Sequence, residues 1–498
     1  MATGSGSGAD LTSGAQDRAE ARSTTGTAVL VSVVAAIGGF LFGFDTAVIN
    51  GAVTAISDAF SLSPFVTGLA VAVALLGSAV GAWYAGRLAD RWGRVKVMLL
   101  GSALFLVSSV GAGLAFSVWD LVIWRFVGGL GIGIASVIAP AYIAEIAPAR
   151  LRGRLGSLQQ LAIVIGIFVA LLSDTALARI AGGADQDFAL GLPAWRWMFL
   201  VGVVPSVVYG VLALRIPESP RYLVAKGETQ QASDVLRRVL GLQRPEDKVR
   251  DIQRTIQRED KPSLADLKGK RLGLMPVVWV GILLSVFQQF VGINVIFYYS
   301  TSLWQSVGFS ESDSFTFSVI TSVTNVVVTL VAIALVDKVG RRPLLLVGSA
   351  GMVLSLLAMT ICFTQATFVG DNPQLAQPYG TIALIAANLY VVSFGVSWGP
   401  VVWVLLGEMF PNKIRAAALA VAAAAQWLAH FAITTTFPVM SKDIALWFAY
   451  GFYTVFAAIS FFFVLTKVPE TKGRELEDMD GEVHVRGRRP AEAAARTS

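Results

Sequence analysis

Long apolar runs, separated by short polar stretches, occupy most of the chain. Runs such as Pro64–Arg87, Val95–Val118 and Thr316–Val336 are close to the roughly 20 mostly apolar residues that cross the hydrocarbon core of a bilayer. About twelve segments of this length fit into the sequence. Because lipid offers the backbone no hydrogen-bond partner, each crossing has to be a helix. The pattern therefore predicts an all-α membrane protein.

Composition agrees with this pattern. Hydrophobic residues make up 55% of the 498 positions and charged residues only 14%, and the mean hydropathy is +0.66. A soluble domain of this length exposes far more charge, so these values exclude one. Cys362 is the single cysteine and lies in an apolar run, which leaves no disulfide or thiolate cluster within one chain.

The formal net charge of +6 follows from the loops in which basic residues gather. These basic residues lie in alternate loops: Arg87, Arg91, Arg94, Lys96, Arg150, Arg152, Arg154, Lys338, Arg341, Arg342, Lys413, Arg415, Lys467, Lys472 and Arg474. The intervening loops carry mainly acidic residues: Asp58, Asp120, Asp185, Asp187, Glu311, Asp313 and Asp371. This positive-inside distribution predicts a multi-pass protein of the cell inner (cytoplasmic) membrane with both termini in the cytoplasm. It accounts for the charge, so we expect no nucleic-acid partner.

A polar segment divides the spans into two groups. We expect a disordered tail over 1–26, six spans over 27–216, a helical linker over 217–272, six spans over 273–466 and a cytoplasmic tail over 467–498. No apolar region with a cleavage site precedes the first span, so we expect no cleaved signal peptide. The Leu and Ile spacing of the linker is typical of short amphipathic helices. The linker is either a solvated connection or a latch between two bundles.

Three motifs of the first group recur in the same order in the second. Asp90–Arg94 corresponds to Asp337–Arg341, Glu145 to Glu408, and Pro217–Arg221 to Pro469–Gly473. Duplicated six-span halves are the organisation of major facilitator transporters, whose substrate lies near the midplane at the repeat interface. The predicted fold is thus twelve transmembrane helices in two pseudo-symmetric six-helix bundles, with cytoplasmic helices between them.

Acidic and basic residues of these motifs form the candidate cytoplasmic gate, in which salt bridges hold the cytoplasmic side closed. The candidates are Asp90, Arg91, Arg94, Glu145, Arg152, Asp337, Arg341, Glu408 and Arg415. The alternative is that these charges only enforce the topology.

Four segments together resemble the sugar porter family, from about Val33 to Gly473. They are Gly38–Gly51, Pro217–Arg221, Gln288–Asn294 and Pro469–Gly473. The family includes bacterial proton-linked xylose, galactose and arabinose symporters and animal facilitative glucose transporters. The resemblance implies a proton-coupled monosaccharide symporter that works by alternating access. We expect it to be a monomer and to use no cofactor or metal. A facilitative sugar uniporter is the alternative.

The resemblance also implies the residues that line the sugar pocket. Amides suit a sugar because they both donate and accept hydrogen bonds, and aromatic rings pack against its C–H groups. The implied residues are Phe42, Gln160, Gln288, Gln289, Asn294, Tyr298, Asn325, Gly399, Trp403, Gln426 and Trp427. Gln159 is expected to act as interhelical packing instead. Gly292 permits a break beside Asn294, and Pro400 a bend near Trp403.

Two positions depart from relatives of this family. Ile167 stands where the pentose-specific symporter has a glutamine, and this less polar wall favours a hexose such as glucose. His430 stands where relatives commonly have asparagine. It either donates a hydrogen bond as a neutral ring or titrates near neutrality.

Asp45 and Arg125 are the candidate proton-coupling pair. Each lies inside an apolar run, where an isolated charge costs about 2.5–3.5 kcal/mol, and pairing relieves both costs. In proton-linked sugar porters, residues at these two positions form the coupling pair. We expect no other acidic residue deep in an apolar span. A purely structural ion pair is the alternative.

Three other classes of protein fit less well. A non-transporting sugar sensor signals through a long cytoplasmic tail, whereas about thirty residues follow the last span. A drug–proton antiporter has a proline-glycine kink in its fifth span, and Leu158–Leu172 lacks one. An enzyme would need a nucleophile–base pair, a phosphate-binding loop or a metal cluster, none of which the sequence suggests.

If Ile167 shapes a hexose pocket, Ile167→Gln should increase xylose uptake relative to glucose uptake, because the new amide supplies hydrogen bonds to sugar hydroxyls. Competition between labelled glucose and xylose in proteoliposomes measures the ratio. An unchanged ratio would place sugar selectivity at other residues.

Overall fold

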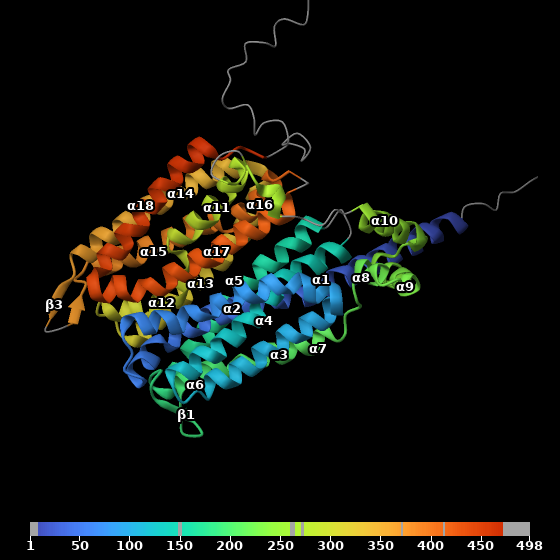
Figure 1. Ribbon diagram of the computed structural model, residues 1–498. Helices are drawn as coiled ribbons and strands as arrows, with labels where there is room; N and C mark the ends of the chain where they lie inside the picture. Colours follow the sequence, from blue (N-terminus) through green and yellow to red (C-terminus); the bar gives the residue numbers. More distant parts are fainter. Residues whose placement is uncertain are drawn as a thin grey trace, which may run out of the picture. The chain divides into compact units, whose positions relative to one another are not determined.

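The computed structural model describes residues 8–147, 152–258, 264–269, 273–369, 372–411 and 414–471 (Figure 1). Within these ranges, eleven helical stretches are long and apolar enough to cross a membrane. Two short antiparallel hairpins occur between helices, formed by β1 (Asp187–Ala189) with β2 (Leu192–Pro193) and by β3 (Thr367–Val369) with β4 (Asn372–Gln374). All the candidate membrane spans are helices, and the short hairpins lie outside them. The prediction of an all-α membrane protein is therefore confirmed.

The chain forms two compact units, Met1–Ser61 with Val73–Asp260 and Leu62–Ala72 with Lys261–Ser498. The spanning helices up to the linker are α1 (Gly8–Ala59), α2 (Pro64–Trp92), α3 (Arg94–Gly113), α4 (Val118–Ile146), α5 (Arg152–Ala181), α6 (Ala194–Val201) and α7 (Val203–Ala213). Helices α6 and α7 together make one span. Helix α1 begins at Gly8, so the expected disordered tail over 1–26 is helical from residue 8. Its Ala, Gln, Arg and Glu residues are good helix formers.

Glycines allow the helices of the first unit to approach closely. A methyl group on Gly129 of α4 would overlap the backbone of Ala74 on α2, and one on Gly133 would overlap Ser78. On α1, a methyl group at Gly43 would overlap the carbonyl of Ile163 on α5. Without side chains at these positions, the backbones pack directly against one another.

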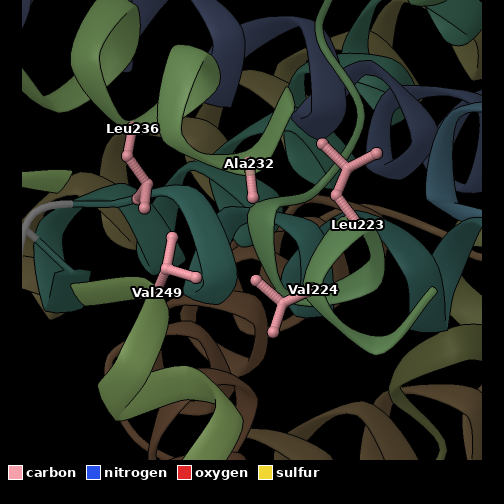
Figure 2. Packing of buried hydrophobic residues seen from close by; sticks show 5 residues of the cluster. All are labelled: Leu223, Val224, Ala232, Leu236 and Val249. Atoms are coloured by element: carbon pink, nitrogen blue, oxygen red, sulfur yellow. The ribbon is translucent and has the colours of Figure 1, made fainter. Parts of the chain in front are cut away.

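The segment after α7 folds into three amphipathic helices, as the Leu and Ile spacing predicted. They are α8 (Pro220–Ala225), α9 (Thr229–Leu240) and α10 (Pro245–Arg258). Their apolar faces meet in a small core formed by Leu223, Val224, Ala232, Leu236 and Val249 (Figure 2). This core belongs to the first unit, so the segment is more than a solvated connection.

The second unit continues with η2 (Leu264–Leu267), α11 (Pro276–Phe290), α12 (Ile293–Ser306), α13 (Glu311–Val339), α14 (Arg341–Thr364), α15 (Tyr379–Gly395), α16 (Trp398–Met409), α17 (Arg415–Val439), η3 (Met440–Ala445) and α18 (Leu446–Lys467). The last candidate span, Ala417–Lys467, has 51 residues. That is about 75 Å of helix, whereas one crossing needs about 30 Å. The π-helical turn η3 and the extended backbone of Ala445 (φ −173°) separate α17 from α18, which gives twelve crossings in the described residues.

Two spans of the second unit are broken. Helices α11 and α12 meet at Gly292, whose φ of 84° is left-handed, as the sequence predicted. Helices α15 and α16 are separated at Val396 and Ser397, slightly before the bend expected near Trp403. Pro400 explains this shift, because a proline ring excludes helical hydrogen bonding to the residue four positions earlier.

Gly292→Ala should destabilise the second unit. A Cβ at this position would lie 2.5 Å from the ring of Tyr453 and would have to adopt the left-handed backbone, which costs about 1 kcal/mol or more before the clash is counted. The melting temperature of the purified variant should fall. Gly407→Ala is the control, because a Cβ there meets nothing within 4 Å; equal melting temperatures for the two variants would contradict the prediction.

Candidate functional site

Asp45 and Arg125 form a buried, two-pronged ion pair. Arg125 Nη1 donates to Asp45 Oδ1 at 3.3 Å and Nη2 to Oδ2 at 3.5 Å. The exposed fractions are 7% for Asp45 and 1% for Arg125. The guanidinium also lies over the ring of Phe199, 5.9 Å from its centroid. The structure therefore brings together the two charges that the sequence proposed as a pair.

Packing between α1 and α5 fixes the position of Asp45. Gly39 lies against Gln159 and Gly43 against Ile163, so the two helices are in backbone contact before and at the turn that carries Asp45. Gln159 fills this helix contact, as expected for an interhelical packing residue. Gln160 and Phe42 are half-buried and Ile167 is buried. These three residues all lie on α1 and α5.

A chain of amides joins the two broken spans of the second unit. Asn294 Nδ2 donates to Gln289 Oε1 at 2.6 Å, and Gln289 Nε2 donates to Gln288 Oε1 at 3.4 Å. Gln288 Nε2 then donates to the carbonyl of Trp398 at 2.8 Å. Trp398 begins α16, just after the second break. The amides thus hold three helix ends together while keeping further donor and acceptor sites available.

The other expected pocket residues of the second unit lie on α12, α13, α16 and α17. Tyr298 is buried, and its ring centroid lies 5.7 Å from that of His430, which stacks with Trp427 at 6.3 Å. Asn325 is buried, and Gly399 is partly buried.

Among the described residues of this group, Trp403 has an exposed side chain and Gln426 has a polar atom without a hydrogen-bond partner. The exposed fraction of Trp403 is 43%. Gln426 Oε1 and His430 Nε2 are buried atoms without a hydrogen-bond partner among the described residues. The side-chain carbonyl of Gln426 is therefore a buried acceptor that no described residue satisfies.

The first motif cluster surrounds Arg94 at the start of α3. The Arg94 guanidinium binds both carboxylate oxygens of Glu145, at 2.9 and 3.1 Å, and Asp90 at 3.3 Å. Glu218 accepts hydrogen bonds from the backbone amides of Arg94 and Val95 at 2.9 and 3.1 Å. A carboxylate at this position accepts hydrogen bonds from the free amides of a helix N-terminus. Its negative charge also interacts favourably with the positive end of the helix dipole.

The second cluster repeats this geometry around Arg341 at the start of α14. Arg341 binds Glu408 at 2.8 and 3.1 Å. Glu470 accepts from the backbone amides of Arg341 and Arg342, both at 3.0 Å. Thr471 donates to Glu408 at 2.6 Å, as Ser219 does to Glu145 at 2.5 Å. The internal repeat is therefore structural as well as sequential.

Some candidate gate residues lie apart from these clusters. The side chain of Arg91 is exposed and forms no ion pair among the described residues. Arg415 Nε donates to the carbonyl of Phe410 at 3.2 Å and not to Glu408. The side chains of Arg152 and Asp337 lie outside the described residues.

Sequence reasoning missed the role of Glu218 and Glu470 at the helix starts. Their recurrence in the repeated motifs was visible, but their contact with α3 and α14 was not. It also missed Asp174, which is fully buried in α5. The expectation that Asp45 is alone among acidic residues deep in a span is wrong. Asp174 lies near the end of its apolar run, where a sequence pattern cannot separate a buried position from a loop position.

Comparisons with known proteins show the family of this chain. The family model described as sugar (and other) transporter matches residues 31–482. A glucose transport protein of Synechocystis sp. is 57% identical over 452 residues, which cover 91% of this chain and 96% of that protein.

A D-xylose-proton symporter of Escherichia coli is 36% identical over 485 residues, covering 90% of this chain and 94% of that protein. The partially occluded, inward-open structure of the xylose transporter XylE from E. coli matches with a TM-score of 0.78 at 34% identity, covering 90% of this chain and all of the other. The chain therefore belongs to the sugar transporter family of the major facilitator fold.

Proposed function

We propose that this protein is a proton-coupled monosaccharide symporter, with a hexose, glucose first, as its substrate. The 57% identical relative is named a glucose transport protein, and the 36% identical relative a D-xylose-proton symporter. The observation that carries the proposal is the buried pair of Asp45 and Arg125. A uniporter needs no such pair, since its cycle moves no proton.

The pair can couple proton binding to a conformational change. While Arg125 contacts both carboxylate oxygens, the carboxylate is stabilised in its charged form. A movement of α4 relative to α1 that separates them leaves a buried carboxylate without its counter-charge. Proton uptake removes that cost, so Asp45 binds a proton in the separated state and releases it when the pair re-forms. A sugar that favours one of the two states then favours one protonation state.

The amide chain supports sugar recognition. Gln288 is held by the Trp398 carbonyl, so the amides of Gln289 and Asn294 are preorganised at the Gly292 break. Sugar hydroxyls can replace the bonds within this chain, since amides donate and accept. The half-exposed ring of Trp403 offers an apolar face for the C–H groups of the sugar.

Localisation and gating complete the proposal. The positive-inside pattern supports a cytoplasmic-membrane protein with both termini in the cytoplasm. The Arg94 and Arg341 clusters would then lie at the cytoplasmic ends of the spans. Each fixes a helix start within its own unit, so we propose that they stabilise one gate conformation. We propose further that the protein is not an enzyme and acts as a monomer.

Replacing Gln289 or Asn294 by alanine should weaken glucose binding by about fivefold or more, because each loss leaves polar groups unpaired at roughly 1–3 kcal/mol. Isothermal calorimetry on purified protein measures the Kd. Gln365→Ala, an exposed amide elsewhere in the second unit, is the control. Wild-type affinity in both site variants would remove these residues from the pocket.

Asp45→Asn should abolish proton-driven sugar accumulation but preserve sugar counterflow. The amide imitates a permanently protonated acid, so sugar still exchanges across the membrane while the proton gradient no longer drives it. Both activities are measured in proteoliposomes with labelled glucose.

Asp58→Asn serves as the control for Asp45→Asn, because Asp58 is an exposed acid on the same helix. Accumulation that survives in Asp45→Asn would show that the proton binds elsewhere. Loss of both activities together would make the pair structural.

A further inference from the structure

A second carboxyl group is buried in a spanning helix of the first unit. Asp174 lies on α5, seven positions before this helix ends at Ala181, and its exposed fraction is 0%. Among the described residues, neither of its carboxyl oxygens completes a hydrogen bond. The backbone amide of Gly51 on α1 is the polar group that approaches it.

The charged groups of the surrounding helices have other contacts. Helix α5 packs against α1, α4, α6 and β1. The described ionisable side chains on these elements are Asp45 and Asp58 on α1, Asp120, Arg125, Tyr142 and Glu145 on α4, Arg179 on α5, Arg196 on α6 and Asp187 on β1. Arg125 binds Asp45, Arg196 donates to the carbonyls of Gly113 and Ala115, and Arg179 is exposed. None of them forms an ion pair with Asp174 in the described part of the chain.

A proton is the ligand that this environment fits. A metal ion needs several ligands, and no group of three or more His, Cys, Asp or Glu side chains occurs in the described residues. A proton needs one oxygen atom. Protonation also makes the carboxyl group neutral. The neutral form has the lower free energy when a carboxyl group is buried without a cation.

Asp174 lies close to the proposed coupling pair. Gly39, Gly43 and Gly51 follow one another along α1, and their partners Gln159, Ile163 and Asp174 follow one another in the same order along α5. Helices α1 and α5 therefore run in the same direction. Gly51 follows Asp45 by six positions, which is about 9 Å along the helix axis. From Asp174 to the end of α5 is about 10 Å. The carboxyl group thus lies between Asp45 and the end of the span.

We propose that Asp174 is a second proton-binding site, which holds a proton while Asp45 is ionised against Arg125 and exchanges it with the solution at the Ala181 end of α5. Its role in transport rests on the proposed proton coupling through Asp45; the binding of a proton by Asp174 does not.

Infrared spectroscopy of the purified full-length protein tests the site directly. A protonated carboxyl group has a C=O stretch that shifts on exchange into D₂O. This band should be present in the wild type and in Asp45→Asn, absent in Asp174→Asn, and weaker as the pH is raised. Asp185→Asn, an exposed acid in the following loop, should leave it unchanged. If Asp174→Asn does not fold, Asp174→Glu should move the band instead of removing it.

Two spectroscopic results would overturn the proposal. A band that persists unchanged in Asp174→Asn, or in Asp174→Glu, would mean that Asp174 is not the protonated group. A band that is assigned to Asp174 but stays constant up to pH 10 would mean that the acid never releases its proton.

Transport tests the exchange step. Proton-driven glucose accumulation, divided by counterflow in the same vesicles, should fall more steeply with rising pH in Asp174→Asn than in the wild type. Coinciding pH profiles would exclude the exchange role. If the proposed coupling through Asp45 is itself wrong, accumulation will survive in Asp45→Asn, a result that leaves the infrared assignment of Asp174 intact.

Discussion

Polar groups that enter a bilayer must find their partners inside the protein, because the hydrocarbon core supplies none. The buried ion pair of Asp45 and Arg125 is the strongest expression of this constraint in the first unit. It requires α1 and α4 to stay close enough for both guanidinium nitrogens to reach both carboxylate oxygens. Any state that separates these helices must neutralise the carboxylate. The proposed link between proton binding and helix movement follows from this cost.

The same constraint explains where glycine occurs. Direct backbone packing places Gly129 and Gly133 against α2 and Gly43 against α5, so the helices that carry the charged pair are held without intervening side chains. Close packing of this kind moves as a rigid element, and a change at one helix is passed to its neighbour. Asp174 on α5 is also fully buried, and no cation among the described residues pairs with its carboxyl group.

The two units have the same contacts at the starts of α3 and α14 but different polar residues at their centres. In each unit, an arginine binds a glutamate of a second helix, and a further glutamate caps the helix that the arginine begins. At the centre, the first unit contains charges, whereas the second contains amides and two broken helices. A neutral, polar ligand suits the amides and a proton suits the carboxylate. The charges of the first unit therefore suit the proposed proton coupling, and the amides of the second suit the proposed contribution to sugar binding.

Apolar run length and positive charge determined much of this protein from sequence alone. They predicted the helical membrane fold, and the repeated motifs predicted its two halves, since both depend on local composition. The break at Gly292 was predictable because it needs one residue type at one position. The capping role of Glu218 and Glu470 and the isolation of Asp174 were decided only in the tertiary structure. Each of these depends on which atoms of a helix distant in the sequence lie nearby, and the pattern of residue types does not predict that.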